Sequence, residues 1–306
     1  MTTYNFDREI DRKKTNSLKY DFAVERGRDV DVLPLWVADM DFQAPKPVLD
    51  ALQNAVSHGI FGYSEVKGEY FDALYRWFDS RFDWQPKSEW LVKTPGVVFA
   101  LAMAVRALTK EGDSVLIQPP VYYPFFEVIR DNNRKIVESP LLLTDGHYEI
   151  DFDDLEEKIT SQNVKLFLLC SPHNPVGRVW TKEELQKLGE LCERYHVFVV
   201  ADEIHCELVY EGHDYTPFAS LSERFRQNSV TCVSPSKAFN LAGLQIANII
   251  AADEGVRRRI DRAININEVC DVNPFGVIAT IAAYNEGSAW LDALRKYLWE
   301  NYEYLY

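Results

Sequence analysis

Short apolar segments rich in β-branched residues recur along the middle of this 306-residue chain, and they constrain its fold more than any other feature. Patterns typical of helices alternate with them at residues 47–58, 97–109 and 182–195, the last preceded by Thr181 in capping-box spacing with Glu184. Strands that alternate with helices predict an α/β fold, a mostly parallel sheet sandwiched by helices. The nearly continuous apolarity of the segments fits strands buried on both faces. We expect these strands at residues 90–93, 114–118, 164–170, 197–201, 229–233 and 245–251.

Turns that carry glycine, proline or polar side chains follow five of these strand segments. In open α/β sheets, ligands bind outside the carboxyl ends of the strands. The turns therefore converge on one edge of the predicted sheet, and we expect the site there. They lie at residues 94–96, 119–122 and 171–175, at Asp202, and at residues 234–237.

Two groups at this edge are suited to binding a cofactor or to catalysis. Ser234-Pro235-Ser236-Lys237 places two hydroxyls and an amine in a tight turn, which we expect to open a helix and to offer N–H groups to a phosphate. A lysine with a lowered pKa can bind a carbonyl compound covalently, although a lysine in such a turn is more often a solvated charge. Asp202 ends a buried strand, where a carboxylate is costly unless it is paired. It could face a pyridinium nitrogen, or it could be an ordinary strand-end carboxylate.

Composition argues against several classes of protein. The net charge of −14 disfavours nucleic-acid binding, which needs a basic surface. No apolar run approaches the roughly 20 residues of a membrane span, and residues 1–14 lack the apolar core of a signal peptide. The five cysteines are scattered without a C-x-x-C pair, so we expect a reducing compartment, the cytoplasm. No metal-ligand spacing occurs, and His205 is interpreted as structural rather than as a metal ligand.

An ordered set of motifs resembles the core of fold-type-I enzymes that use pyridoxal 5'-phosphate (PLP), in the aminotransferase superfamily. These motifs are Asn174-Pro175 within S-P-H-N-P-V-G, Asp202-Glu203, and Lys237 within S-P-S-K, and the resemblance runs from at least Trp36 onward. Each motif alone is common, whereas the ordered set is specific to this group.

A closer resemblance is to the MalY/PatB branch, the cystathionine β-lyase-like carbon–sulfur lyases. Two departures from typical aminotransferases favour this branch: His205 stands in place of a tyrosine, and Leu244-Gln245-Ile246 stands in place of an arginine after the lysine. The matching motifs are W-V-A-D-M-D-F at 36–42, F-G-Y at 61–63, P-V-Y-Y-P-F-F at 120–126, D-E-I-H-C-E at 202–207 and S-K-A-F-N-L-A-G-L at 236–244.

This resemblance implies roles for residues around the cofactor ring. Lys237 would carry PLP covalently and later move the Cα proton of the substrate. Asp202 would pair with the ring nitrogen, and Asn174 would hydrogen-bond the 3-oxygen of the ring. Tyr122 would stack on the ring face, although it could equally be a core aromatic. Trp36 is interpreted as packing or substrate contact.

The resemblance also implies a phosphate site and a homodimer. The backbone N–H groups of Gly96 and Val97 would bind the phosphate at a helix N-terminus, together with Ser234 and Ser236. Tyr63 would reach the phosphate in the neighbouring subunit, unless it packs on its own subunit.

The expected reaction is the α,β-elimination of L-cystathionine, L-cystine or another S-substituted cysteine. An aminotransferase is one alternative, and an inactive PLP-binding protein is another. The last alternative arises because, in this family, the arginine that would bind the substrate carboxylate lies in a C-terminal segment. We expect that segment to be truncated here, because the sequence stops at Tyr306 inside a helical pattern of Leu291, Leu294, Leu298 and Tyr302. We therefore expect an incomplete small domain. The predicted division is residues 1–46 (small-domain segment), 47–286 (PLP-binding domain) and 287–306 (connecting helix).

Overall fold

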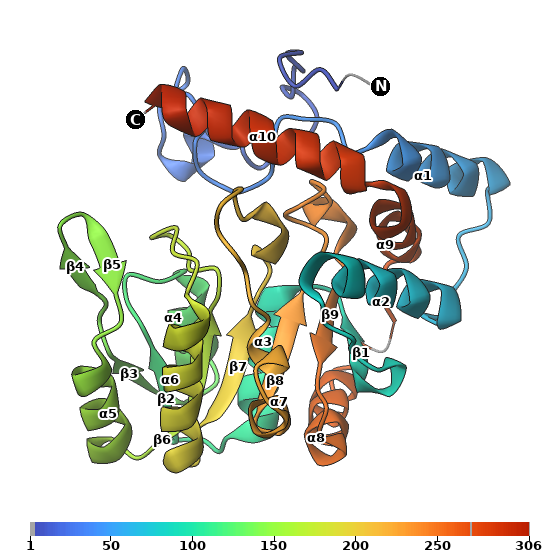
Figure 1. Cartoon of the computed structure of the whole chain (residues 1–306). Helices are drawn as coiled ribbons and strands as arrows, with labels where there is room; N and C mark the ends of the chain where they lie inside the picture. The colour runs from blue at the N-terminus through green and yellow to red at the C-terminus, as the bar shows by residue number, and fades with distance from the viewer. Residues whose placement is uncertain (1–3, 270, 306) are drawn as a thin grey trace.

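The computed structural model describes residues 4–269 and 271–305, and its centre is a seven-stranded sheet (Figure 1). The strand order is β1-β9-β8-β7-β6-β2-β3. The inner strands are short and mostly buried, as expected for a sheet covered on both faces, whereas the edge strands β1 and β3 are only partly buried. The strands are β1 (Leu91–Thr94), β2 (Ser114–Ile117), β3 (Lys135–Glu138), β6 (Val164–Cys170), β7 (Phe198–Asp202), β8 (Ser229–Val233) and β9 (Ala247–Ile250).

The predicted fold class is confirmed, with one strand running against the others. Strands β3, β2, β6, β7 and β8 pair in parallel, whereas β9 is antiparallel to both β8 and β1. The predicted strand 245–251 begins two residues too early, because Gln245 has a left-handed φ of 51° after the 3-10 turn η5 (Ala242–Leu244). Sequence analysis did not predict β3 or the small hairpin of β4 (Leu142–Thr144) and β5 (His147–Glu149).

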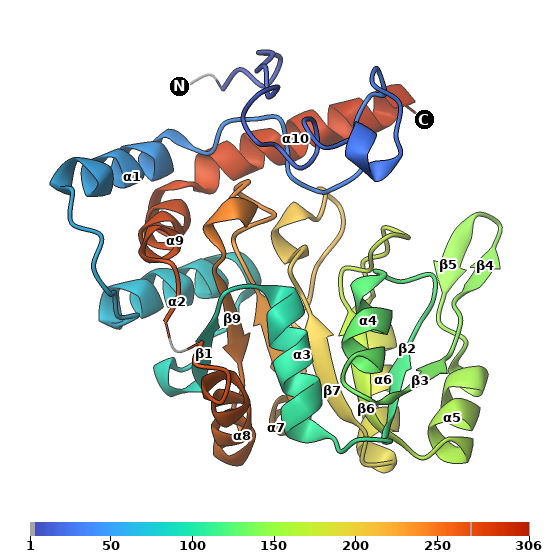
Figure 2. The ribbon, with the colours of Figure 1, turned by 180° about the vertical axis from the view of Figure 1, so that it is seen from behind.

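Helices cover both faces of the sheet, as the front and back views show (Figures 1 and 2). Side chains of one helix group pack with the sheet in one buried cluster, and those of the other group form a second cluster on the opposite face. The first group is α3 (Val97–Leu108), α4 (Pro124–Arg130) and α8 (Glu254–Asn265); the second is α5 (Phe152–Ser161), α6 (Lys182–Arg194) and α7 (Glu223–Gln227).

A third cluster joins one end of the sheet, through residues of β8 and β9, to the helices near both ends of the chain. Trp77 stacks on Tyr284 with ring centroids 5.0 Å apart, and Phe6 meets Trp290 at 5.7 Å. The N-terminal segment therefore packs against the last helix, and both ends lie on the same side of the molecule (Figure 1). The helices here are α1 (Lys46–His58), α2 (Gly68–Phe82), α9 (Pro274–Glu286) and α10 (Ser288–Leu305).

The three helices predicted from the sequence are confirmed to within one residue at each end as α1, α3 and α6. The capping box before α6 is also present: Glu184 N donates to Thr181 Oγ1 at 3.1 Å, and Thr181 N donates to Glu184 Oε2 at 2.7 Å. The apolar pattern that ends at Tyr302 lies on α10. Within residues 4–269 and 271–305, the structure contains no helix with the length and apolarity needed to span a membrane.

Candidate active site

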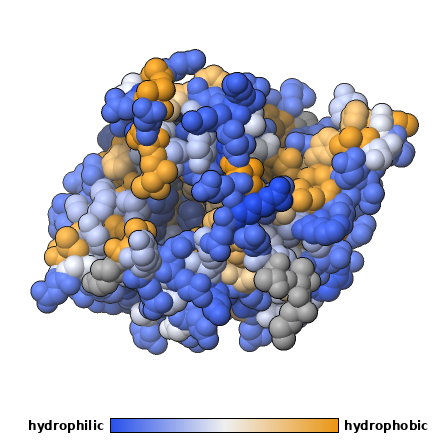
Figure 3. Space-filling view, turned by 90° about the horizontal axis from the view of Figure 1, so that it is seen from above, coloured by the Kyte–Doolittle hydropathy of each residue, from blue (hydrophilic) through white to orange (hydrophobic). Residues whose placement is uncertain are grey.

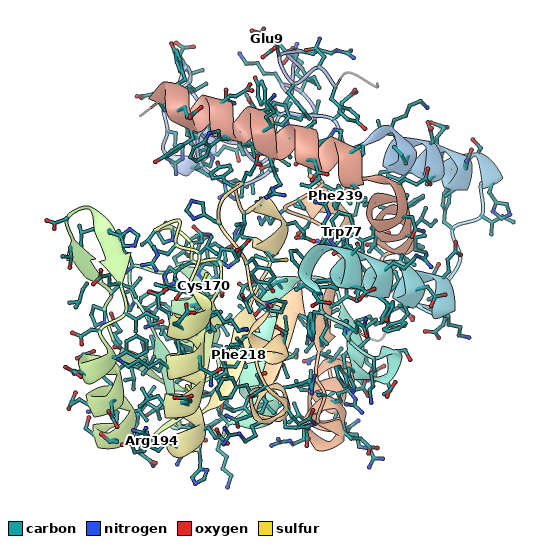
Figure 4. All side chains as sticks on the ribbon, in the orientation of Figure 1. Glu9, Trp77, Cys170, Arg194, Phe218 and Phe239 are labelled. Atoms are coloured by element: carbon teal, nitrogen blue, oxygen red, sulfur yellow. The ribbon has the colours of Figure 1, made fainter. Side chains whose placement is uncertain are left out.

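The predicted turns lie together at one edge of the sheet. Because β1, β2, β6, β7 and β8 point in the same direction, their carboxyl ends share that edge. Figure 4 shows Cys170, at the end of β6, near the edge of the sheet that faces α10. Arg194, at the end of α6, lies near the opposite edge. The face above the strand ends is hollowed, with hydrophobic patches beside the hollow (Figure 3).

Asp202 is the last residue of β7, and its side chain is buried, with 4% of the residue exposed. Ile204 N donates to its Oδ1 at 3.2 Å. Burial raises the pKa of Asp202 to about 7, while the bond from Ile204 and the charge of Lys237 act in the opposite direction. A cation placed against this carboxylate would keep it ionised at neutral pH.

Lys237 lies in a turn after β8, and the expectation that this turn opens a helix is wrong. Phe239 N donates to Pro235 O and Leu241 N to Ser236 O, both at 3.0 Å, and Asn240 then takes a left-handed φ of 57°. Since that conformation cannot continue a right-handed helix, the chain turns instead. Burial lowers the pKa of Lys237, and the charges of Asp202 and Asp39 oppose that shift. Lys237 is therefore close to two carboxylates.

Two serines of the same turn differ in how free their hydroxyls are. Ser234 is buried; its Oγ donates to Ile246 O at 2.6 Å and accepts from Ser236 N at 3.1 Å. A hydroxyl has one hydrogen to donate, so a phosphate contact of Ser234 would have to replace the bond to Ile246. Ser236 is half-buried. The phosphate roles of both serines stay predictions.

Gly96 and Val97 begin helix α3 directly after β1. Gly96 is the N-cap residue, no side chain caps the helix, and a Cβ added at Gly96 would meet nothing within 4 Å. The first N–H groups of an α-helix have no partner within the helix, so they are available to an anion. This geometry supports the predicted phosphate contact.

Asn174 and Tyr122 come from the turns after β6 and β2, and both are half-buried. His173 Nε2 lies 3.0 Å from Pro120 O and joins the two turns, while Asn174 N donates to Cys170 Sγ at 3.3 Å. The pKa of Tyr122 is raised mainly by burial and further by the negative charges of Tyr123 and Asp202. Tyr122 is thus near the buried carboxylate, as the predicted stacking role requires.

His205 and Trp36 were interpreted as structural or packing residues. His205 follows Asp202 in the loop after β7, and burial lowers its pKa to about 4, helped by the charge of Lys237. It is therefore a neutral imidazole near the lysine. Trp36 is half-buried, and the Arg28 guanidinium lies 4.2 Å above its ring. Residues 4–269 and 271–305 contain no group of three His, Cys, Asp or Glu side chains suited to a metal ion.

Tyr63 is the one predicted residue that the single chain does not bring to the site. It lies between α1 and α2 and is 98% exposed, while nearby Phe61 packs on Phe275 at 5.8 Å. Its predicted role in a neighbouring subunit stays a prediction.

Sequence analysis missed Asp39 and Asn240. Both lie in motifs that were matched, W-V-A-D-M-D-F and S-K-A-F-N-L-A-G-L, but no role was given to either. The available signals were two aspartates within an otherwise apolar motif and an asparagine in a tight turn.

Known proteins share this fold and these motifs. The family model for aminotransferase class I and II matches residues 30–306. Cystathionine beta-lyase PatB of Bacillus subtilis (strain 168) is 48% identical over 97% of this chain and 77% of its own length. Protein MalY of Escherichia coli (strain K12) is 32% identical over 99% of this chain and 77% of its own length.

A solved structure gives the same result in three dimensions. The PLP-bound C-S lyase from Staphylococcus hominis superposes with a TM-score of 0.93 at 38% identity, covering 99% of this chain and 76% of that one. Its fold is the fold-type-I arrangement that the motifs implied. The chain therefore belongs to the aminotransferase class I and II family, within the branch that contains PatB and MalY.

Proposed function

We propose that the chain is a PLP-dependent carbon–sulfur β-lyase. It would eliminate a thiol from L-cystathionine, L-cystine or another S-substituted cysteine and leave pyruvate and ammonia. The observation that carries the proposal is that buried Asp202 ends β7, that Lys237 follows the neighbouring strand β8, and that the charge of Asp202 acts on Lys237. The 48% identity to a protein named cystathionine beta-lyase supports the choice of reaction.

The residues at the sheet edge fit PLP. Asp202 is a buried carboxylate with a raised pKa, which a protonated ring nitrogen would pair with. The uncapped first turn of α3 at Gly96 and Val97 suits the phosphate, with Ser236 and, if its turn rearranges, Ser234. Asn174 would donate to the ring oxygen and Tyr122 would cover one ring face.

Each of these residues has a task in the proposed reaction. PLP, when bound, supplies the electron-withdrawing ring that accepts the electron pair left at Cα. Lys237 would hold the cofactor and, once its amine is free, would take the Cα proton of the substrate. Asp202 would keep the ring nitrogen protonated, and Tyr122 would orient the ring. The net reaction would release the thiol from Cβ and, with one water, leave pyruvate and ammonia.

Two features distinguish this proposal from an aminotransferase. Leu244-Gln245-Ile246 stands where aminotransferases of this superfamily usually carry an arginine after the lysine, and His205 stands in place of their tyrosine. The neutral His205 leaves no additional positive charge beside Lys237. Both observations favour elimination over transamination.

We also propose a cytoplasmic homodimer. Tyr63 is 98% exposed on an extended segment, which suits a residue that contributes to the partner's phosphate site. In the described part of the chain, all four cysteines are buried free thiols, which suits a reducing compartment; Cys270 lies outside the described residues.

The test of the function is pyruvate release from L-cystathionine by the PLP-loaded chain, with no keto acid added. We expect continuous pyruvate and thiol production that Lys237→Ala abolishes. Turnover that requires a keto acid would favour an aminotransferase. Bound PLP without pyruvate would favour the inactive alternative, and full activity in Lys237→Ala would refute the role of the lysine.

A further inference from the structure

Asn240, three residues after Lys237, ties the lysine turn to a segment 200 positions earlier in the chain. Its Oδ1 accepts from Met40 N at 2.9 Å. Its Nδ2 donates to Met40 O at 2.9 Å and to Phe42 O at 2.8 Å. A carboxamide can accept at one end and donate twice at the other, whereas no carboxylate or hydroxyl can form this set of bonds. Asn240 therefore clamps residues 38–42 against the turn.

The turn that holds this clamp is itself anchored. Phe239 and Leu241, on either side of Asn240, are 0% and 4% exposed. Phe239 stacks on Trp290 of α10 at 6.1 Å and meets Trp77 edge-on at 5.5 Å, and Figure 4 shows it beneath α10. Because both neighbours are buried, the amide of Asn240 keeps a defined position relative to Lys237.

The clamped segment carries Asp39 toward the lysine. Asp39 directly precedes Met40, which Asn240 of the lysine turn holds by two hydrogen bonds, and the charge of Asp39 opposes the burial that lowers the pKa of Lys237. Arg12 pairs with Asp39 through Nη2 and with Asp41 through Nη1, the latter at 2.8 Å, and Lys19 Nζ donates to Asp39 O at 2.9 Å. Arg12 thus holds the side chain of Asp39, and Lys19 holds its backbone oxygen.

The charged and titratable groups around Lys237 come from three places in the chain. Asp202 lies below it at the end of β7, His205 is in the following loop, and Asp39 lies on the clamped segment. Asp202 is committed to the ring nitrogen in the proposed function. Of the two carboxylates whose charges affect Lys237, Asp39 is therefore the one that influences the amine throughout the reaction.

We propose that Asn240 is a positioning residue, which fixes residues 38–42 over the site and so keeps Asp39 facing Lys237. This inference rests on the proposed function for its absorbance readout, which needs PLP on Lys237, and for its kinetic part. A nearby carboxylate favours the protonated form of the lysine nitrogen. It also makes the free amine a stronger base for removing the Cα proton.

Asn240→Gly is the direct test, because glycine accepts the left-handed φ but has no amide. Asn163→Gly is the matched control: Asn163 also has a left-handed φ of 50°, and it lies in the turn before β6, at the opposite edge of the sheet. Asp39→Asn keeps the clamp and removes the charge. All three variants are prepared with PLP bound.

Two readouts do not depend on turnover. Hydrogen exchange at the Met40 amide should accelerate at least about tenfold in Asn240→Gly, the factor expected for losing one ordinary hydrogen bond, and should be unchanged in Asp39→Asn. The pH at which the visible absorbance of lysine-bound PLP changes should fall in both variants, because each removes the negative charge from beside the nitrogen. Asn163→Gly should leave both readouts in place.

The kinetic readout is kcat/KM for L-cystathionine, expected to fall about tenfold or more in Asn240→Gly and Asp39→Asn. A clamp that served stability alone would accelerate exchange but leave the absorbance transition and kcat/KM unchanged, and that result would overturn the inference. If Asn240→Gly does not fold, an unshifted absorbance transition in Asp39→Asn would overturn it. An inactive wild-type chain would instead refute the proposed function, while the absorbance transitions would still decide the inference.

Discussion

Burial and charge act against each other at Asp202 and Lys237. Burial disfavours the charged form of both groups, so the pKa of the carboxyl is raised, to about 7, and that of the amine is lowered. Their mutual attraction opposes both shifts. Groups whose pKa values are perturbed in this way at the end of a strand are typical of catalytic sites.

Asp202→Asn tests the role of the carboxylate. The change keeps the shape of the side chain and removes its charge, so the ring nitrogen is no longer held protonated. We expect kcat/KM for L-cystathionine to fall about a hundredfold or more, the scale seen when a preorganised electrostatic group is removed from an active site. Steady-state pyruvate assays measure the effect. Asp214→Asn, which removes an exposed carboxylate, serves as the control; equal rates in the two variants would contradict the assigned role.

The sequence predicts which residues reach the site better than it predicts their bonds. Asp202, Asn174 and Lys237 follow apolar strand segments, so their place at the sheet edge follows from the parallel arrangement. The engagement of Ser234 with Ile246 depends on the approach of β9, which sequence periodicity does not reveal. The clamp by Asn240 joins segments 200 positions apart, and no local pattern predicts such a pairing.

At the scale of elements, long apolar and well-capped segments were predictable and short exposed ones were not. The strands β6 and β8 and the capped helix α6 match their predicted ranges closely. The hairpin β4–β5 has two strands of only three residues that are largely exposed, so its short leucine run did not identify a strand. The direction of β9 follows from the η5 turn and Gln245, whose left-handed backbone is not evident from glutamine.

The loop after β7 holds a second buried carboxylate that makes stability depend on pH. Glu203 is 0% exposed; Phe218 N donates to its Oε1 at 2.9 Å, and Tyr215 Oη donates to its Oε2. Burial raises its pKa to about 8, against the two hydrogen bonds. Between the ordinary value of 4.5 and about 8, the folded chain keeps a proton that the unfolded chain loses. The contribution of Glu203 to the free energy of unfolding is therefore largest at low pH and decreases as the pH rises through that window.

Glu203→Gln should remove this fall, because a neutral amide imitates the protonated carboxyl. From about pH 5 to about pH 8, the unfolding free energy of the variant should decline less than that of the wild type, by up to about 1.4 kcal/mol per pH unit. Urea unfolding at several pH values measures the slopes. Glu183→Gln, at an exposed position on α6, should keep the wild-type slope. Parallel curves for wild type and Glu203→Gln would contradict the buried-proton explanation.

At the scale of the whole molecule, the sheet edge that carries the site borders the third cluster of packed side chains. The sheet and its two helix layers supply Asp202, Lys237 and Asn174, while the third cluster joins the N-terminal segment to α10 through Phe6 and Trp290. This contact supports our proposed division, in which residues 1–46 and 287–306 are small-domain parts and residues 47–286 bind PLP. Asn240 bonds to Met40, the residue after Asp39, where the N-terminal segment meets the lysine turn.

The central claim is that Lys237 carries PLP in this chain. The most direct measurement is borohydride reduction of the PLP-loaded protein followed by peptide mass mapping. The account predicts one pyridoxyl-modified peptide, with the modification on Lys237, and none in Lys237→Ala. Modification of a different lysine, or bound PLP that reduction does not fix to any lysine, would contradict it.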